Sequence, residues 1–302
     1  MFIIRRLLWL GPVLLAVTFI TFVLMHLVPG GPWDAEKALP PAVVENLNRR
    51  YGLDAPYWQQ YVNFIWHALQ GDLGLSFIRQ NQTVTEILLQ GLPVTATLAG
   101  LALSLALSIG MVLGVLAALR QNTWVDYLSV AFATLGASTP NFVLGIILVL
   151  TLSVMLKLVP TSGWGSPQHL LLPTITLSAF PAAYIARITR SSMLDVIRQD
   201  YVRTARAKGL PEQLVVTRHI LKNALIPVLT VAGPIAANLV TGSFVIETLF
   251  AIPGVGRLFV QSVLARDYGL IMGAVVFYTV VISLANLVVD ILYALVDPRI
   301  RY

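Results

Sequence analysis

The chain has 302 residues, of which 57% are hydrophobic and only 11% are charged, and its formal net charge at pH 7 is +6. An ordinary soluble domain carries about 25% charged residues, so this composition excludes a large soluble helical protein with an apolar core. The chain contains no cysteine, which excludes disulfide frameworks and thiolate metal or redox sites.

A first apolar segment covers residues 7–28 and follows Arg5 and Arg6. Its basic front resembles that of a signal peptide, but the segment is long enough to span a bilayer and has no cleavage site of small residues. We therefore expect residues 1–28 to form a retained first transmembrane span.

Residues 29–93 carry acidic and aromatic side chains and are too long for a hairpin. Prolines open two predicted helices, 40–50 and 56–69, which are stopped by Gly52 and Gly71. We therefore expect a small helical extracytoplasmic domain after the first span.

The second of these helices places Tyr57, Tyr61 and Ile65 on one face, at a spacing of four residues. Two interpretations stay open for the domain. It is either a docking surface for an external partner or a helical cap packed on the mouth of the bundle.

Further apolar segments follow, and together with the first they predict an all-α, polytopic transmembrane bundle of about six spans. They cover residues 94–119, 127–158, 170–190, 225–250 and 270–296. Residues 94–302 then form the membrane core. Prolines in the later spans predict bent helices; they are Pro140, Pro173, Pro181, Pro227 and Pro234.

An even number of spans places both termini on one side of the membrane. Most basic residues fall on that side, whereas the short loops opposite hold only Lys157, Arg257 and Arg266. Positively charged loops stay cytoplasmic, so we expect both termini in the cytoplasm and a location in a bacterial inner (plasma) membrane. The positive net charge follows from this topology and requires no nucleic acid as a partner.

The cytoplasmic connection between the fourth and fifth spans is predicted to be a helical elbow at residues 195–223. Ile197, Tyr201 and Ala205 share one face of its first helix, and basic side chains project elsewhere. The sequence therefore predicts an amphipathic helix at the start of the elbow.

The tip of the elbow is predicted to turn tightly. Gly209 suits the left-handed cap of the first helix, and Pro211 suits the first turn of a second helix that returns to the membrane. Small side chains at Thr204, Ala205 and Ala207 would let the groove of a partner protein approach the backbone. The alternative is an interfacial helix that lies on lipid, with its basic residues on anionic headgroups.

The elbow also carries a family resemblance. The run TARAKG at 204–209, followed by RHILKNALIPVL at 218–229, resembles the EAA loop of ABC importer membrane subunits, in the variant of oligopeptide, dipeptide and nickel permeases. The general pattern has Glu, Ala, Ala where this chain has Arg203, Thr204 and Ala205. A role special to that Glu is therefore not carried over.

Other stretches resemble signatures of the same family, in matching order along nearly the whole chain. The likeness is closest to the first membrane subunit of oligopeptide importers, partly because of LPP at 39–41. The signatures are PGGP at 29–32, YGLDAP at 51–56, GDLGLSF at 71–77, ARITRSSM at 186–193, VIETLFAIPGVG at 245–256, ARDYGL at 265–270 and DPRIRY at 297–302.

The resemblance implies one half of an alternating-access permease for oligopeptides or dipeptides. The implied partners are a second homologous permease subunit, two ATP-binding cassette ATPase subunits that use ATP and Mg, an extracytoplasmic peptide-binding protein and the lipid bilayer. No enzymatic activity and no cofactor are expected in this chain itself. The implied ATPase-docking residues are Tyr201, Arg203, Thr204, Ala205, Arg206, Ala207, Lys208, Gly209 and Leu210.

The resemblance also places an outer gate in the loop after the fifth span, where proline and glycine would allow a sharp bend. Glu247 is either a conformation-dependent partner of Arg257 or Arg266, or a static cap at a helix end. The gate residues are Glu247, Pro253, Gly254, Gly256 and Arg257.

Polar side chains inside apolar spans are candidates for lining the translocation path, because they are best hidden from lipid. They are Asn238, Thr241, Ser243 and Asn286. Asp290, near the inner end of the last span, is instead expected to pair with an inner arginine.

The chain lacks the Walker A, HExxH and GxSxG patterns of nucleotide-binding and hydrolytic sites. Its four histidines are scattered, so no catalytic residue and no metal ligand are expected. Two alternatives stay open. One is a permease half for nickel or another small solute, and the other, from a different class, is a membrane-embedded enzyme or scaffold.

Overall fold

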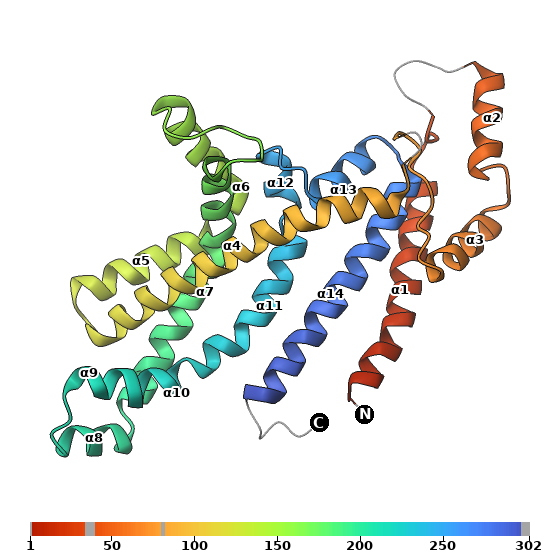
Figure 1. Ribbon diagram of the computed structural model, residues 1–302. Coiled ribbons are helices and arrows are strands. Elements are labelled where there is room, and N and C mark those ends of the chain that lie inside the picture. Colours follow the sequence, from red (N-terminus) through yellow and green to blue (C-terminus); the bar gives the residue numbers. More distant parts are fainter. Residues whose placement is uncertain (1, 34–39, 80–81, 297–302) are drawn as a thin grey trace. The chain divides into compact units, whose positions relative to one another are not determined.

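The computed structural model describes residues 2–33, 40–79 and 82–296 (Figure 1). The described chain is helical apart from its loops and one isolated antiparallel β-bridge between Leu75 and Thr83. The DPRIRY ending and the Leu of the LPP motif lie outside the described residues.

The chain divides into two compact units, each of which is described by itself. The first unit consists of residues 1–95 and 253–287, and the second of residues 96–252 and 288–302. Two long helices contribute one part to each unit; they are α4 (Val84–Leu119) and α14 (Tyr268–Val296).

Among the described residues, five helices are long and apolar enough to cross a membrane, or up to six if one bent pair counts as a single span. The five are Leu8–Leu27, Val84–Leu119, Pro167–Ile197, Ile226–Leu249 and Tyr268–Val288. The predicted all-helical fold of about six spans is therefore confirmed.

The bent pair replaces the predicted third span. Helix α5 (Trp124–Ser138) ends before Pro140, helix α6 (Asn141–Leu148) begins after it, and the chain bends there by 105°. Thr139 is extended, with φ −91° and ψ 120°, because the ring of a following proline disfavours helical backbone. The sequence predicted a kinked helix, but the structure has a complete break.

The helices of the first unit begin and end close to the residues that the sequence predicted. Gly52, with a left-handed φ of 67°, ends α2 as expected, and α3 covers nearly the predicted second helix. The elements of this unit besides parts of α4 and α14 are α1 (Phe2–Leu27), α2 (Pro41–Tyr51), α3 (Tyr57–Leu69) and α13 (Val255–Leu264). Its buried core is Leu73, Val84, Ile87, Leu88, Val255, Leu258, Leu270 and Ala274.

Helix α7 (Pro167–Ile197) is the central element of the second unit, and α5, α6 and α11 pack against it. It continues through Pro173 and Pro181, both buried. The other elements are η1 (Val149–Met155, a π-helix), α8 (Asp200–Ala207), α9 (Glu212–Leu214), η2 (Val215–Leu221, a π-helix), α10 (Lys222–Ala224), α11 (Ile226–Gly242) and α12 (Phe244–Leu249).

Two glycines on α4 bring this helix close to α7. A Cβ atom at Gly110 would lie 2.7 Å from the carbonyl oxygen of Ala182, and one at Gly114 would lie 2.6 Å from that of Ala186. Small residues one turn apart allow such backbone approach between helices in a membrane.

Candidate functional site

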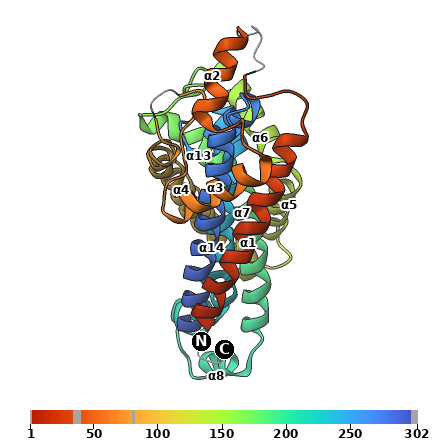
Figure 2. The ribbon, with the colours of Figure 1, turned by 90° about the vertical axis from the view of Figure 1, so that its right-hand side faces the viewer.

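The predicted elbow is present at the C-terminal end of α7, where α8 forms one arm and α9, η2 and α10 form the other (Figure 1; α8 is also labelled in Figure 2). Gly209 adopts the expected left-handed backbone with φ 77°. Its amide donates to the carbonyl of Arg206 at 2.9 Å, which ends α8. Pro211 immediately precedes α9 rather than lying within its first turn.

The inward face of α8 differs from the prediction. The chain leaves helical geometry around Gln199, so Ile197 belongs to α7, and the buried residues of α8 are Val202 and Ala205. Ala205 is only 4% exposed, so it lies on the apolar face as predicted, but not among the small outward side chains with which it was also grouped. Tyr201, the other predicted member of that face in α8, is 42% exposed.

A compact apolar core supports the elbow from within. Val202 and Ala205 pack together with residues of α4, α7, η2 and α10 in one buried cluster; its members are Ala118, Met193, Val202, Ala205, Val215, Ile220 and Ala224. Burial of a contiguous apolar cluster is the main source of local stability. The two arms are therefore held in a fixed arrangement without a bound partner.

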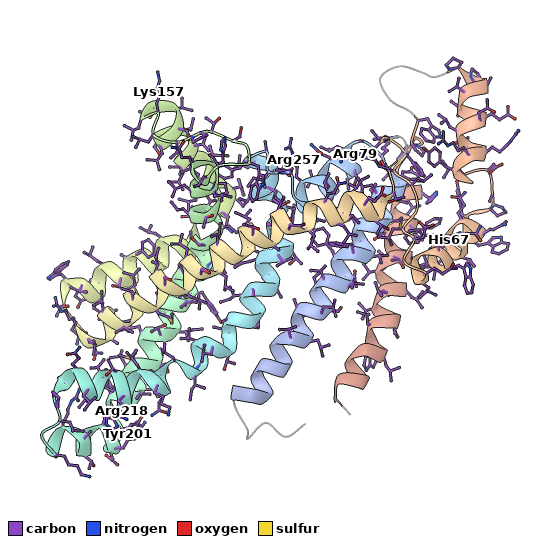
Figure 3. The ribbon with its side chains drawn as sticks, viewed as in Figure 1. His67, Arg79, Lys157, Tyr201, Arg218 and Arg257 are labelled. Atoms are coloured by element: carbon purple, nitrogen blue, oxygen red, sulfur yellow. The ribbon has the colours of Figure 1, made fainter. Side chains whose placement is uncertain are left out.

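Polar contacts also connect the two arms, which Tyr201 and Arg218 mark in Figure 3. The Tyr201 hydroxyl accepts a hydrogen bond from Asn223 Nδ2 at 2.9 Å. Arg206 forms a bidentate pair with Glu212, with Nε to Oε2 at 3.1 Å and Nη2 to Oε1 at 2.6 Å. This geometry is the stronger, directional form of ion pair.

The same pair shifts the titration of both groups. The hydrogen bond from Arg206 lowers the pKa of Glu212 below its ordinary value, and the hydrogen bond to Glu212 raises the pKa of Arg206. Arg206 therefore links the two arms of the elbow. The exposed side chains on the outward side of α8 and its cap are Arg203, Thr204, Ala207 and Lys208. Arg203 makes only a loose contact of 3.6 Å with Asp200.

The predicted gate residue Glu247 lies in α12 and is fully buried. Its Oε1 accepts a hydrogen bond from the hydroxyl of Ser243 at 2.7 Å, one helical turn earlier. Two residues that were assigned to separate sites, a gate and a path, thus form one hydrogen-bonded pair.

The loop that follows Glu247 bends at Gly254, directly before α13, in extended backbone geometry. Its left-handed residue is Ala251, with φ 54°, whereas Gly254 has φ −92° and Gly256 lies inside α13. The predicted bend is therefore present, although its left-handed residue is Ala251, and the gate assignment stays a prediction. Pro253, Gly254, Gly256 and Arg257 belong to the first unit, whereas Glu247 belongs to the second.

The predicted path residues do not form one cluster within a unit. On α11, Asn238 is exposed and the Thr241 hydroxyl bonds the carbonyl of Ala237 at 3.1 Å. Asn286 belongs to the first unit, where it lines a cavity of about 160 Å³ with Trp9 and other residues of α1 and α14. The side chain of Asp290 lies outside the described residues. The path assignment stays a prediction.

One buried ion pair was missed by the sequence reasoning. Asp126 at the start of α5 accepts two hydrogen bonds from Arg190 on α7, at 2.6 and 2.8 Å. It also accepts the amide of Asn122 at 3.0 Å. A signal was available, because Asp126 is the one acidic residue between Glu86 and Asp195 in the sequence and isolated acids in apolar segments need a partner.

Asp267 was also missed, although it lies inside the quoted ARDYGL motif. It is 1% exposed. Its carboxylate accepts hydrogen bonds from the Ser76 hydroxyl at 2.5 Å and from the amides of Phe77 and Leu270, both at 3.0 Å. Two of the signature motifs, GDLGLSF and ARDYGL, therefore meet in the first unit at the start of α14.

Within the described residues, no group of three or more His, Asp or Glu side chains could hold a metal ion. The chemistry present is hydrogen bonding and ion pairing that fix helices and loops.

Two family models together match almost the whole chain. Residues 110–302 match the model described as binding-protein-dependent transport system inner membrane component, and residues 1–99 match the model of its N-terminal part.

Curated relatives match along their full lengths. The chain is 45% identical over 300 residues to the dipeptide transport system permease protein DppB of Bacillus subtilis, covering 99% of this chain and 97% of the relative. It is 43% identical over 303 residues to the oligopeptide transport system permease protein OppB of Salmonella typhimurium, covering 100% and 99%.

Solved structures share the fold at lower identity. The inward-facing MetNI methionine ABC transporter matches with a TM-score of 0.59 and 19% identity, over 70% of this chain and 96% of that one. An amino acid ABC transporter with histidines matches with a TM-score of 0.56 and 16% identity, over 69% and 93%.

Proposed function

This chain belongs to the inner membrane components of binding-protein-dependent transport systems, the permease subunits of ABC importers, and we propose that its cargo is a dipeptide or an oligopeptide. Relatives that match along the whole chain carry the names dipeptide and oligopeptide permease. The outer domain, in which specificity could differ, is included in both alignments.

The proposed assembly contains a second permease subunit, two ATPase subunits that use ATP and Mg, and an extracytoplasmic peptide-binding protein. The elbow is the proposed docking element for the ATPase. The observation that carries this assignment is its construction: an apolar core and the Arg206–Glu212 pair fix its shape, while small and basic side chains face outward. A rigid helix of this shape suits a groove.

The proposed orientation follows from the elbow and from the basic residues. With the elbow in the cytoplasm, both termini are cytoplasmic and residues 29–93 face the outside of a bacterial inner membrane. Glu247 and the loop 253–257 remain proposed gate residues. The work of ATP hydrolysis then reaches this chain as mechanical contact at the elbow, which rotates the bundle as a rigid body.

Substitution of Gly209 by Leu tests the docking assignment. No atom lies within 4 Å of a Cβ at Gly209, so the added side chain projects outward, where a partner would be. We expect loss of ATPase co-purification and of transport-coupled hydrolysis, with membrane insertion unchanged. Gly209→Asn, which tolerates left-handed backbone, should have a smaller effect.

Gly52→Leu is the matched control. Gly52 also caps a helix with left-handed backbone, and it also has no atom within 4 Å of its Cβ position. Gly52→Leu introduces the same kind of backbone strain outside the elbow, so transport-coupled ATP hydrolysis should be unchanged. Normal coupling in Gly209→Leu would contradict the docking assignment.

A separate experiment tests the cargo. Cells that lack other peptide uptake systems, and that express the complete importer, should accumulate labelled dipeptides or oligopeptides. Accumulation of ⁶³Ni²⁺ instead of peptides would contradict the peptide assignment but would leave the importer fold and the docking element intact.

A further inference from the structure

Helix α3 has a face that packs on α1 within the first unit. The Tyr57 ring lies 4.7 Å from the His26 ring, measured between centroids. The Tyr61 ring lies 5.6 Å from Phe19 and 5.5 Å from Phe22. The Tyr61 hydroxyl donates to the main-chain carbonyl of Leu15 at 3.0 Å. This face fixes α3 against the side of a transmembrane helix.

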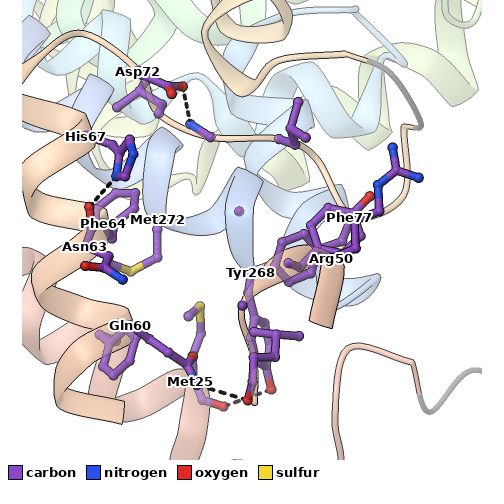
Figure 4. A pocket seen from close by; sticks show the side chains of 18 of the residues that line it. Met25, Arg50, Gln60, Asn63, Phe64, His67, Asp72, Phe77, Tyr268 and Met272 are labelled. Atoms are coloured by element: carbon purple, nitrogen blue, oxygen red, sulfur yellow. Dashed lines mark hydrogen bonds between the residues drawn. The ribbon is translucent and has the colours of Figure 1, made fainter. Parts of the chain in front are cut away.

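A second face of α3 is polar. Gln60, Asn63 and His67 line a cavity of about 400 Å³, which is also lined by Tyr268 and Met272 of α14 (Figure 4). His67 Nδ1 bonds the carbonyl of Asn63 at 2.7 Å, one turn earlier. This face therefore borders a cavity within the first unit, and it is distinct from the face that packs on α1.

A third face of α3 is large, apolar and uncovered. Trp58, Val62, Trp66 and Leu69 follow at helical spacing and are 70%, 54%, 65% and 78% exposed. We call these four side chains the outer stripe. They lie on a different side of the helix from both the α1-packing residues and the polar residues. A soluble surface rarely presents two tryptophans in such a patch.

The depth of α3 along α1 identifies what covers the outer stripe. At a rise of 1.5 Å per residue, Phe22 and Phe19 lie roughly 8 and 12 Å before the end of α1 at Leu27. Leu15 lies about 18 Å before that end. The Tyr61 contacts therefore place α3 beside the apolar span Leu8–Leu27 and not beyond it.

We propose that α3 is an interfacial membrane helix, whose outer stripe lies among the acyl chains and headgroups of the leaflet at which α1 ends. Helices of this kind insert about 5–10 Å into that boundary, and the Phe22 ring that Tyr61 touches lies at about that depth from the end of α1. In the proposed orientation this leaflet is the outer one. The proposal concerns the placement of α3 and does not depend on the cargo.

Composition and continuity support lipid as the occupant. Residues 55–71 contain no Asp, Glu, Lys or Arg, and tryptophan is enriched at membrane interfaces. Phe19, which touches Tyr61, is itself 54% exposed on the apolar surface of α1. The outer stripe thus lies beside an exposed apolar surface of the span Leu8–Leu27. A soluble protein that covered the stripe would have to lie alongside this span and not beyond its end.

Site-directed spin labelling tests the proposal, and the chain suits it because it contains no cysteine. Single cysteines replace Val62 and Leu69 on the outer stripe. The controls are Asn63, on the polar face of the same helix, and Gln70, its C-terminal cap residue. The full-length chain, with the subunits that co-purify, is labelled with a nitroxide in vesicles of phosphatidylethanolamine and phosphatidylglycerol. The signal of the unsubstituted assembly is subtracted.

Relaxation by oxygen and by a water-soluble nickel chelate then gives the result. We expect the labels at Val62 and Leu69 to respond several-fold more to oxygen than to the chelate, and the controls to show the reverse. Stronger response to the chelate at the stripe would mean that it faces water. Weak response to both would mean that a protein subunit covers it. Either of these outcomes overturns the proposal.

A second measurement avoids new cysteines. Lipids brominated on their acyl chains should quench part of the tryptophan fluorescence, and Trp66→Phe should remove part of that quenched signal. Trp33→Phe is the control, because Trp33 lies in the aromatic cluster with Tyr51 and Phe77. Equal quenching in wild type and Trp66→Phe would count against a lipid-facing stripe.

Discussion

Asp126 and Arg190 lie 64 positions apart in the sequence and form a bidentate ion pair that joins α5 to α7. The Asp126 side chain is 3% exposed and that of Arg190 is 28% exposed. Asp126 lies in the first turn of α5, the helix that ends just before the break at Pro140, so this pair ties the start of α5 to α7.

Asp126→Asn should lower the stability of the detergent-solubilised protein. A buried hydrogen bond to a charged group contributes about 1.5–3 kcal/mol, and the substitution also leaves the Arg190 charge without its counter-charge. We expect a fall of several degrees in the melting temperature. Arg49→Gln is the control, because it removes the exposed Arg49–Glu45 pair, which contributes less than about 1 kcal/mol. Equal losses would contradict a structural role for Asp126.

Asp267→Asn should loosen the loop at residues 72–79. The carboxylate accepts hydrogen bonds from Ser76, Phe77 and Leu270. The side-chain amide of Asn has one NH₂ group in place of an acceptor oxygen, so at least one of these hydrogen bonds is lost. We expect a loss of about 2 kcal/mol or more, detected as faster hydrogen exchange at the amides of Phe77 and Leu270. Unchanged exchange at both amides would show that the loop is held by other contacts.

Gly269→Ala tests the same junction by steric means. A Cβ at Gly269 would lie 2.2 Å from the main-chain oxygen of Leu75, so the loop or the helix must move. We expect a destabilisation of about 1–3 kcal/mol, measured as a lower melting temperature. Gly100→Ala, at a helical site with no atom within 4 Å, should be neutral or stabilising. A Gly269→Ala protein as stable as wild type would refute the close approach.

The Arg206–Glu212 pair should make the elbow sensitive to acid. Because the pKa of Glu212 is lowered in the folded elbow, the stabilisation is present above its ordinary value of 4.5 and is lost as the pH falls through the lowered value. Both side chains are more than a third exposed, so we expect less than about 1 kcal/mol. Hydrogen exchange at residues 203–210, corrected for its intrinsic pH dependence, measures the effect.

Glu212→Gln should raise that exchange at neutral pH, by up to about five-fold, and should remove its acid dependence. Asp200→Asn is the matched control, because the Arg203–Asp200 contact is longer and more exposed. Acid-induced loosening that persists in Glu212→Gln would show that another group is responsible.

The local features of this fold were predictable, and the reasons are visible at particular residues. Gly52 and Gly209 ended helices as predicted, because a left-handed cap depends on the backbone freedom of a single residue. Pro140 predicted an irregularity in its span, because proline disfavours helical backbone at the residue before it. The same steric rule does not predict the bend angle, which is 105°.

The non-local features were not predictable from one sequence. No local signal marked the break at Gln199, so the apolar face was assigned to Ile197, Tyr201 and Ala205, and the buried Val202 was missed. The contact between Ser76 and Asp267 joins residues 191 positions apart. The sequence around either residue contains no signal that identifies the other as its partner. Ala251 adopts left-handed backbone without being Gly or Asn, so its residue type gave no signal for this conformation.

The unbroken course of α7 has a mechanical consequence. Its 31 residues form a rod about 46 Å long. Near one end Met193 is clamped in the elbow core, and toward the other Thr176 packs close to Gly145 on α6. If a helix of this length tilts by about 10° about its elbow end, its far end moves by about 8 Å.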